Sequence, residues 1–152
     1  MITIGRKDRI DLPELNLLNL EAKIDTGAFG CAIHCHDIKV VSLAGRDTLQ
    51  FDLLDPEHPD YEKEIFQFSE FGKKTVKSTN GESEDRYTIV SDLIVFNTRY
   101  QVEFSLTNRA DMRTPVLLGR KFLSKRFIVD VAKKDLSYKL KKKENRSSVE
   151  KL

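Results

Sequence analysis

The sequence has little of what marks several large classes of protein. Its only cysteines, Cys31 and Cys35, stand four positions apart, which is a poor basis for a disulfide framework. No stretch approaches the roughly 20 consecutive apolar residues of a membrane-spanning helix. Residues 1–10 alternate charged and apolar groups instead of forming the apolar part of a signal peptide. We therefore expect a cytoplasmic protein with free thiols and no membrane partner.

A net positive charge is confined to one segment. The formal net charge is +2, but residues 139–152 hold six Lys or Arg against two Glu, so this tail carries +4 and the body −2. A domain that binds nucleic acid usually carries its positive charge on a folded face, with groups that read or stack on bases. We expect no nucleic-acid partner. The apolar pattern fades from Lys139 onward, so we expect a basic, disordered tail over 139–152.

What is present describes one folded domain over residues 1–138. Hydrophobic residues make up 39% of the 152 positions and include nine Phe, whereas disordered chains are poor in large apolar residues. A single core commonly holds a chain of this length.

Strand patterns dominate this domain. Apolar and polar residues alternate without a break over 100–106, as in a half-buried strand. Short turn segments at 44–46, 78–81 and 97–98 separate β-rich runs and predict three hairpins. The best helical signal covers only 120–125. We expect an all-β fold with one short C-terminal helix.

One segment delivers a carboxylate to a tight turn. Residues 22–28 read Ala-Lys-Ile-Asp-Thr-Gly-Ala, an apolar strand followed by Asp25, Thr26 and Gly27. The glycine lets backbone N–H groups approach the carboxylate, and the Thr26 hydroxyl can hold it in one orientation. Alone, so short a match is more often an ordinary turn.

A second segment makes the pattern far more specific. Residues 115–123 form an apolar strand that ends at Gly119 and continues into a short helix. Alone, this reads as a core strand. Together the two segments resemble the retropepsins, single-domain aspartic proteases that work as homodimers.

The resemblance extends over roughly residues 4–140 and points to one bacterial and archaeal family. That retropepsin-like family is labelled ATP-dependent zinc protease and is often encoded beside RimK-type ligases, which add glutamate to protein C-termini. The matching positions are Gly5-Arg6, Asp25 to Ala28, His34, Asn80-Gly81, Glu84 to Arg86, Leu106 to Arg109, Met112, Leu117 to Arg120 and Arg126-Phe127.

The resemblance implies a retropepsin-like closed barrel, a homodimer, and an aspartic peptidase that trims glutamate-extended C-termini, with a RimK-type ligase as a further partner. It places Asp25, Thr26 and Gly27 in the catalytic site. The residues expected to bind the peptide are Ala28, His34, Gly81, Glu84, Arg86, Asn108 and Arg109.

Several of these positions have a second interpretation. The hairpin around Asn80-Gly81 is the candidate flap or an ordinary hairpin, and Glu84 and Arg86 contact substrate or pair across strands. Asn108-Arg109 lines the site or closes a turn. Arg109, Arg113 and Arg120 are candidate partners for substrate carboxylates, although Arg120 also resembles a retropepsin arginine that ties the dimer together.

The mechanism needs two carboxylates that share one proton, whereas the chain has one Asp-Thr-Gly. We therefore expect a two-fold dimer in which Asp25 of each copy meets its mate across the axis. Phe29-Gly30-Cys31 replaces the basic residue, Thr and Ser usual in the family. This departure favours an alternative, a non-catalytic module of the same fold that binds acidic peptides or the ligase.

A zinc-dependent peptidase is the third interpretation. Cys31, His34, Cys35 and His36 are the only cluster of soft metal ligands, and a strand would turn them to opposite faces. The sequence has neither Gly-x-x-x-x-Gly-Lys-Ser/Thr nor His-Glu-x-x-His. We expect no metal and no cofactor.

Overall fold

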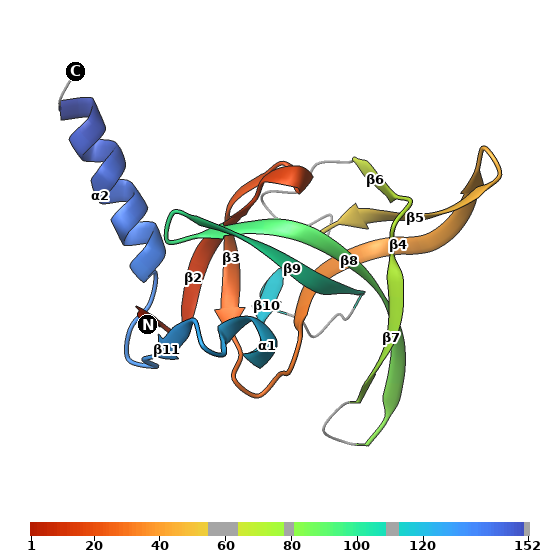
Figure 1. Cartoon of the computed structure of the whole chain (residues 1–152), viewed down its shortest axis with the longest axis horizontal. Helices are drawn as coiled ribbons and strands as arrows, with labels where there is room; N and C mark the ends of the chain where they lie inside the picture. The colour runs from red at the N-terminus through yellow and green to blue at the C-terminus, as the bar shows by residue number, and fades with distance from the viewer. Residues whose placement is uncertain (55–63, 78–80, 109–112, 151–152) are drawn as a thin grey trace.

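The computed structural model describes residues 1–54, 64–77, 81–108 and 113–150 (Figure 1). Most of the chain is strand, as the sequence predicted. The strands are β1 (Ile2–Ile4), β2 (Lys7–Leu12), β3 (Leu17–Ile24), β4 (Cys31–Leu43), β5 (Arg46–Leu53), β6 (Ile65–Phe68), β7 (Gly72–Lys77), β8 (Ser83–Val95), β9 (Thr98–Thr107), β10 (Val116–Leu118) and β11 (Phe127–Val129). A 3-10 turn at Pro13–Leu15 and the helices α1 (Arg120–Leu123) and α2 (Leu136–Glu150) complete the fold.

The main sheet curves back on itself. Its strand order is β10-β3-β2-β8-β9-β4-β5-β6, β7 is added to β8, and β4 pairs a second time with β10. This second pairing closes the strand order into a ring. The ring is least continuous between β2 and β8, which share one register pair, Asp11 with Ile94. The all-β class is confirmed, whereas the expected closed barrel is present only in part.

The predicted hairpins are present. Ala44 and Gly45 join β4 to β5 with φ of 51° and 77°, and Phe96 and Asn97 join β8 to β9 with φ of 51° and 55°. Left-handed pairs of this kind match the twist of the flanking strands. The second turn lies one residue before its predicted place. The tip of the β7–β8 hairpin, 78–80, lies outside the described residues.

An aromatic group fixes α1 to the sheet. The Phe122 ring of α1 lies 5.3 Å from Tyr100 of β9 and 5.5 Å from Phe127 of β11, between ring centroids. Aromatic pairs in these arrangements stabilise by about 0.5–1.5 kcal/mol beyond their buried area. The short helix predicted over 120–125 is therefore held in one place, next to the end of β3 (Figure 1).

The expected disordered tail is a helix instead, α2. Its first turn is held by groups from distant strands: the Asp8 carboxylate accepts N–H bonds from Ser137 (2.9 Å) and Tyr138 (3.1 Å). Farther along, Lys141 Nζ lies 2.9 Å from Asp11 Oδ2. The sequence pattern missed α2 because these partners lie more than a hundred residues away. Neither helix, in the part of the chain described, is long and apolar enough to cross a membrane.

Candidate active site

Asp25 stands where β3 ends. The last pair of the parallel β3–β10 ladder is Ile24 opposite Leu118, and the Asp25 N–H donates to the Leu118 carbonyl at 2.9 Å. The chain then turns: Gly27 N–H donates to Asp25 Oδ1 at 3.0 Å and Ala28 N–H to the Asp25 carbonyl at 3.2 Å. Residues 25–30, here called the Asp25 loop, thus hold the carboxylate through their own backbone.

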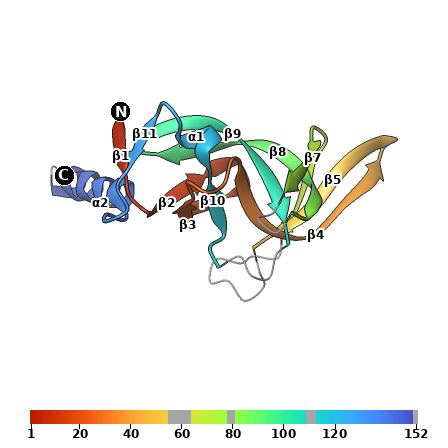
Figure 2. The same cartoon turned by 90° about the horizontal axis from the view of Figure 1, so that it is seen from below.

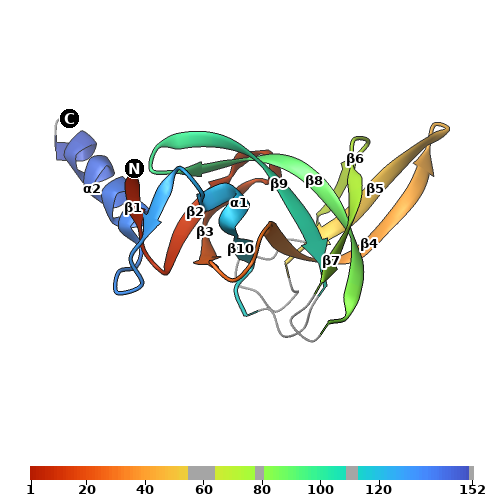
Figure 3. The same ribbon diagram turned by 60° about the horizontal axis from the view of Figure 1, so that its bottom comes forward.

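The segment around α1 fixes this loop from the other side. The N–H groups of Arg120 and Lys121 donate to the carbonyls of Ala28 (2.9 Å) and Phe29 (2.8 Å). Arg120 Nη1 donates to the Thr26 carbonyl at 2.9 Å, and its guanidinium lies 6.0 Å from the centre of the Phe29 ring. Arg120 therefore positions the loop within its own chain. Figure 3 shows α1 and β10 beside this loop.

Gly119 is what allows this contact. A Cβ at Gly119 would lie 2.2 Å from the Gly30 carbonyl oxygen and 2.8 Å from those of Ala28 and Phe29. No side chain fits there. The Asp25 segment and the 115–123 segment predicted from the sequence therefore pack against each other only with a glycine at position 119.

The outer side of the Asp25 loop is open. Asp25 is half-buried, Thr26 and Gly27 are exposed, and 59% of Phe29 is accessible to solvent. A fixed, accessible carboxylate can act as a base toward water. It cannot supply the second, protonated carboxyl of an aspartic dyad.

The other predicted residues lie on different elements of the fold. His34 is buried in β4, where its backbone N–H donates to Pro115 and its carbonyl accepts from Leu54. Asn108 follows β9 and is exposed. Arg109 lies outside the described residues.

On the candidate flap, Glu84 and Arg86 pair with each other along β8, with 3.2 Å between Arg86 Nη2 and Glu84 Oε2. Arg86 is nearly buried, at 9% exposure. The pair lies along one strand, not across two strands as the second interpretation from the sequence had it. Gly81 is exposed at the end of the hairpin, with φ of 84°.

Sequence reasoning missed Lys74. The β7–β8 hairpin and the Asp25 loop reach the same side of the molecule (Figure 1). A Cβ built on Gly30 would lie 2.9 Å from Lys74 Nζ, so this amine contacts the end of the loop. Two adjacent lysines on an exposed strand give no sequence signal for such a contact.

The residues present do not fit a zinc centre. Cys31 and Cys35 are buried free thiols, and burial raises the pKa of both, with Asp52 adding to the effect at Cys35. His36 Nε2 lies 3.2 Å from Asp52 Oδ2. Among the residues that the structure describes, no three His, Cys, Asp or Glu side chains gather as metal ligands would.

Comparisons with known proteins identify relatives of this chain. The chain is similar to two proteins named probable alpha-L-glutamate ligase, at 33% identity over 131 residues in Shewanella pealeana and 32% over 131 residues in Shewanella halifaxensis. Each match covers 84% of this chain, which spans only 28% of the length of these relatives.

A solved structure shows the same fold. It is a Legionella pneumophila protein of unknown function, with a TM-score of 0.68 and 24% identity, and the match covers 90% of this chain and 98% of that one. A family profile described as retropepsin-like aspartic endopeptidase RimB matches residues 3–140, which include the Asp25 loop, Gly119 and α1. The chain therefore belongs to the RimB-like family of retropepsin-like proteins.

Proposed function

We propose that this protein is an aspartic-type peptidase that works as a homodimer, with one Asp25 from each chain. The observation that carries the proposal is the Asp25 carboxylate, held by the Gly27 N–H at the end of a paired strand and open to solvent on its other side. The family profile that matches this chain is described as a retropepsin-like aspartic endopeptidase, and this description supports the proposal.

The need for a second copy follows from the chemistry. The ionised carboxylate of the dyad takes a proton from water, and the protonated one donates to the carbonyl of the peptide bond. Two carboxylates about 3 Å apart, both ionised, would repel by about 5–6 kcal/mol at an effective dielectric constant of about 20. One proton therefore stays on the pair, and cleavage follows a bell-shaped pH profile that belongs to the pair.

The exposed side of the Asp25 loop is the surface that the second copy would cover. Phe29, Thr26 and Gly27 are exposed residues of this loop, and Phe29 is the large apolar side chain among them, with 59% exposure. A large apolar side chain beside a carboxylate is costly to leave in water and is stabilised by burial. The β7–β8 hairpin, on the same side of the molecule, is the candidate flap (Figure 1).

The substrate in this proposal is a peptide or a protein C-terminus extended by glutamate. Support comes from the relatives named probable alpha-L-glutamate ligase. This chain corresponds to just over a quarter of their length. A RimK-type ligase that makes such tails is the partner we propose, in the cytoplasm.

The test is hydrolysis of a protein that carries a C-terminal oligoglutamate tail, followed by mass. The natural chain is compared with Asp25→Asn, which keeps the shape and removes the ionisable group. We expect the tail to shorten with the natural chain only. Shortening that survives Asp25→Asn would exclude the dyad.

A binding module that holds acidic peptides without cutting them is the second candidate. Phe29 favours it, because this exposed apolar residue follows the Asp25 turn at a position where the family usually has a basic residue. Binding of the tailed protein without shortening, by the natural chain and by Asp25→Asn alike, would support this candidate.

A further inference from the structure

A pocket lies at the end of the Asp25 loop, between α1, β9 and the β7–β8 hairpin. Its volume is about 140 Å³, similar to a cavity that holds a benzene ring. Gly30 brings the loop to its edge, Lys74 comes from the hairpin and Lys121 from α1. A space of this size beside the candidate catalytic loop fits one side chain of a bound peptide.

Positive charge exceeds negative charge in this pocket. Lys74, Lys121 and Arg126 line it, against one carboxylate, Glu103 of β9. Glu103 Oε1 lies 3.6 Å from Lys74 Nζ, which leaves Lys121 and Arg126 without a carboxylate among the described lining residues. The balance is three cations to one anion, a net +2.

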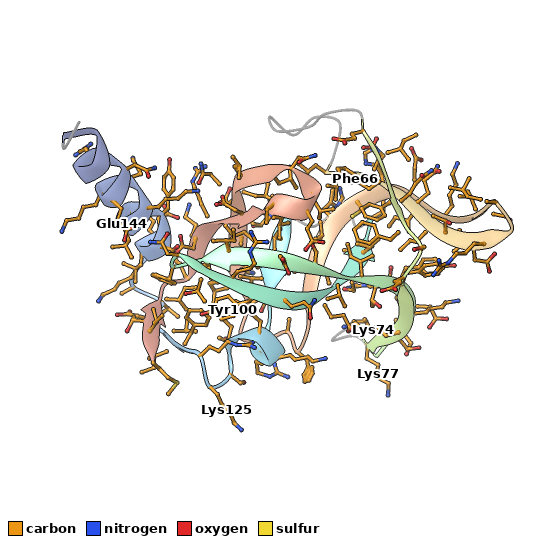
Figure 4. All side chains as sticks on the ribbon, turned by 45° about the horizontal axis from the view of Figure 1, so that its top comes forward. Phe66, Lys74, Lys77, Tyr100, Lys125 and Glu144 are labelled. Atoms are coloured by element: carbon orange, nitrogen blue, oxygen red, sulfur yellow. The ribbon has the colours of Figure 1, made fainter. Side chains whose placement is uncertain are left out.

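One of the cations is held firmly. The Arg126 guanidinium lies 5.3 Å from the Tyr100 ring centre and 5.4 Å from that of Phe122, and Nη1 donates to the Phe122 carbonyl at 2.9 Å. Because an arginine stacked on aromatic rings loses little further freedom on binding, it is suited to a carboxylate. Figure 4 labels Lys74 on β7 and Tyr100 on β9.

The three cations all act electrostatically on one group of the pocket, the Cys31 thiol. Cys31 lies inside the pocket, and burial raises the pKa of its thiol. The charges of Lys74, Lys121 and Arg126 act in the opposite direction, since each favours the thiolate. An anion in the pocket would be favoured by the same three charges, while Val102 and Phe122 offer apolar surface to a methylene chain.

We infer that this pocket binds the carboxylate of an acidic side chain in the peptide held at Asp25. The inference rests on the proposed function and adds to it which residues select the substrate. Charge-assisted hydrogen bonds favour a carboxylate over an amide of the same shape. An uncharged amide in the pocket would leave the cations without a counter-charge. Of the three arginines named from the sequence, Arg120 is bound to the Asp25 loop, Arg113 does not line this pocket, and Arg109 lies outside the described residues.

The test measures binding apart from cleavage. Tetraglutamate and tetraglutamine are titrated calorimetrically into the Asp25→Asn protein, which we expect to bind tetraglutamate more tightly. Lys121→Gln weakens that binding by about two- to fivefold, the range for a partly exposed ion pair. Glu103→Gln tightens it by a similar factor, because the pocket loses its only repulsive charge among the described residues. A general loss of structure would weaken binding in both variants.

Lys73→Gln is the matched control. Lys73 precedes Lys74 on β7, but its amine lies 5.7 Å from the centre of the Tyr87 ring and does not line the pocket. The control removes the same charge from a lysine outside the pocket, so it keeps the natural affinity. Equal binding of the two peptides overturns the inference, as does no binding of tetraglutamate or an equal loss with Lys73→Gln.

The pocket and the peptidase can fail separately. If the natural protein cleaves nothing while Lys121→Gln weakens and Glu103→Gln tightens tetraglutamate binding and Lys73→Gln leaves it unchanged, the pocket stands and the peptidase proposal fails. If the Lys121→Gln and Glu103→Gln variants shorten a tailed protein with the same rate and the same KM as the natural protein, the peptidase proposal stands and the pocket is overturned.

Discussion

At the scale of single residues, Gly119 decides whether the two halves of the site can meet. Its backbone lies against three carbonyl oxygens of the Asp25 loop, with Gly30 nearest. Arg120 and Lys121 then donate their N–H groups to the same loop. The backbone here does not need a positive φ, so the glycine is required by close approach alone.

We expect Gly119→Ala to lower the free energy of unfolding by about 1–3 kcal/mol, because overpacking forces the backbone to move. The loop would shift with it, so cleavage of a tailed protein would fall as well. Urea unfolding measures the first effect. Gly45→Asn is the control: a Cβ added at Gly45 would meet no atom within 4 Å, and asparagine tolerates the left-handed φ of 77° better than most residues do. Natural stability in Gly119→Ala would contradict the packing shown here.

At the scale of elements, α2 shows how a helix begins under tertiary control. The Asp8 side chain is fully buried and accepts N–H bonds from Ser137, Tyr138 and its neighbour Arg9. Over residues 139–146 the side chains of α2 are mostly exposed, and the helix extends away from the sheet (Figure 2). Its attachment therefore depends on a few polar contacts.

We expect Asp8→Ala to cost about 1–3 kcal/mol of unfolding free energy, since it leaves buried N–H groups without a partner. The amides of Ser137 and Tyr138 would then exchange with solvent faster, as measured by hydrogen exchange. The control Asp47→Ala changes an exposed carboxylate on β5. Unchanged protection of the α2 amides in Asp8→Ala would contradict this role.

The pH dependence of this contact has a definite sign. Burial raises the pKa of Asp8 above the ordinary value of 3.8, and the three backbone N–H groups offset this only in part. The folded state therefore binds the proton more tightly than the unfolded state, so this group contributes more stability as pH falls toward 3.8. In urea unfolding at several pH values, the free energy of unfolding of the natural chain should rise relative to that of Asp8→Asn as the pH falls toward 3.8.

At the scale of the whole molecule, the proposed site is half a site. One chain carries one Asp-Thr-Gly, and the face of the Asp25 loop with Phe29 is open. An isologous two-fold contact would place the same loop from both chains face to face.

Mixing experiments test this at the level of the assembly. When equal amounts of natural chain and Asp25→Asn exchange subunits, only about a quarter of the dimers contain two natural chains. We expect activity to fall to about a quarter of that of the natural protein at the same total concentration. A fall to about half would mean that chains act independently. A single monomeric species in sedimentation with substrate present would also exclude the shared dyad.

Comparison of the predictions with the structure separates local from distant causes. The β9 pattern, the Gly45 turn and the short helix after Gly119 were predicted because each is set by neighbours within a few residues. The start of α2 and the Lys74 contact were missed. Their partners, Asp8 and Gly30, are distant in the chain, and no periodicity signals them.

For this protein, the sequence by itself determined the β class, the position of Asp25 at the end of a strand and the resemblance to the retropepsins. Strand periodicity, turn residues and a glycine-bound carboxylate are local properties. Only the tertiary structure decided that Arg120 holds the loop, that Lys74, Lys121 and Arg126 share a pocket, and that the basic tail begins as a helix. These features depend on contacts between distant segments, which exist only after the sheet has curved and brought them together.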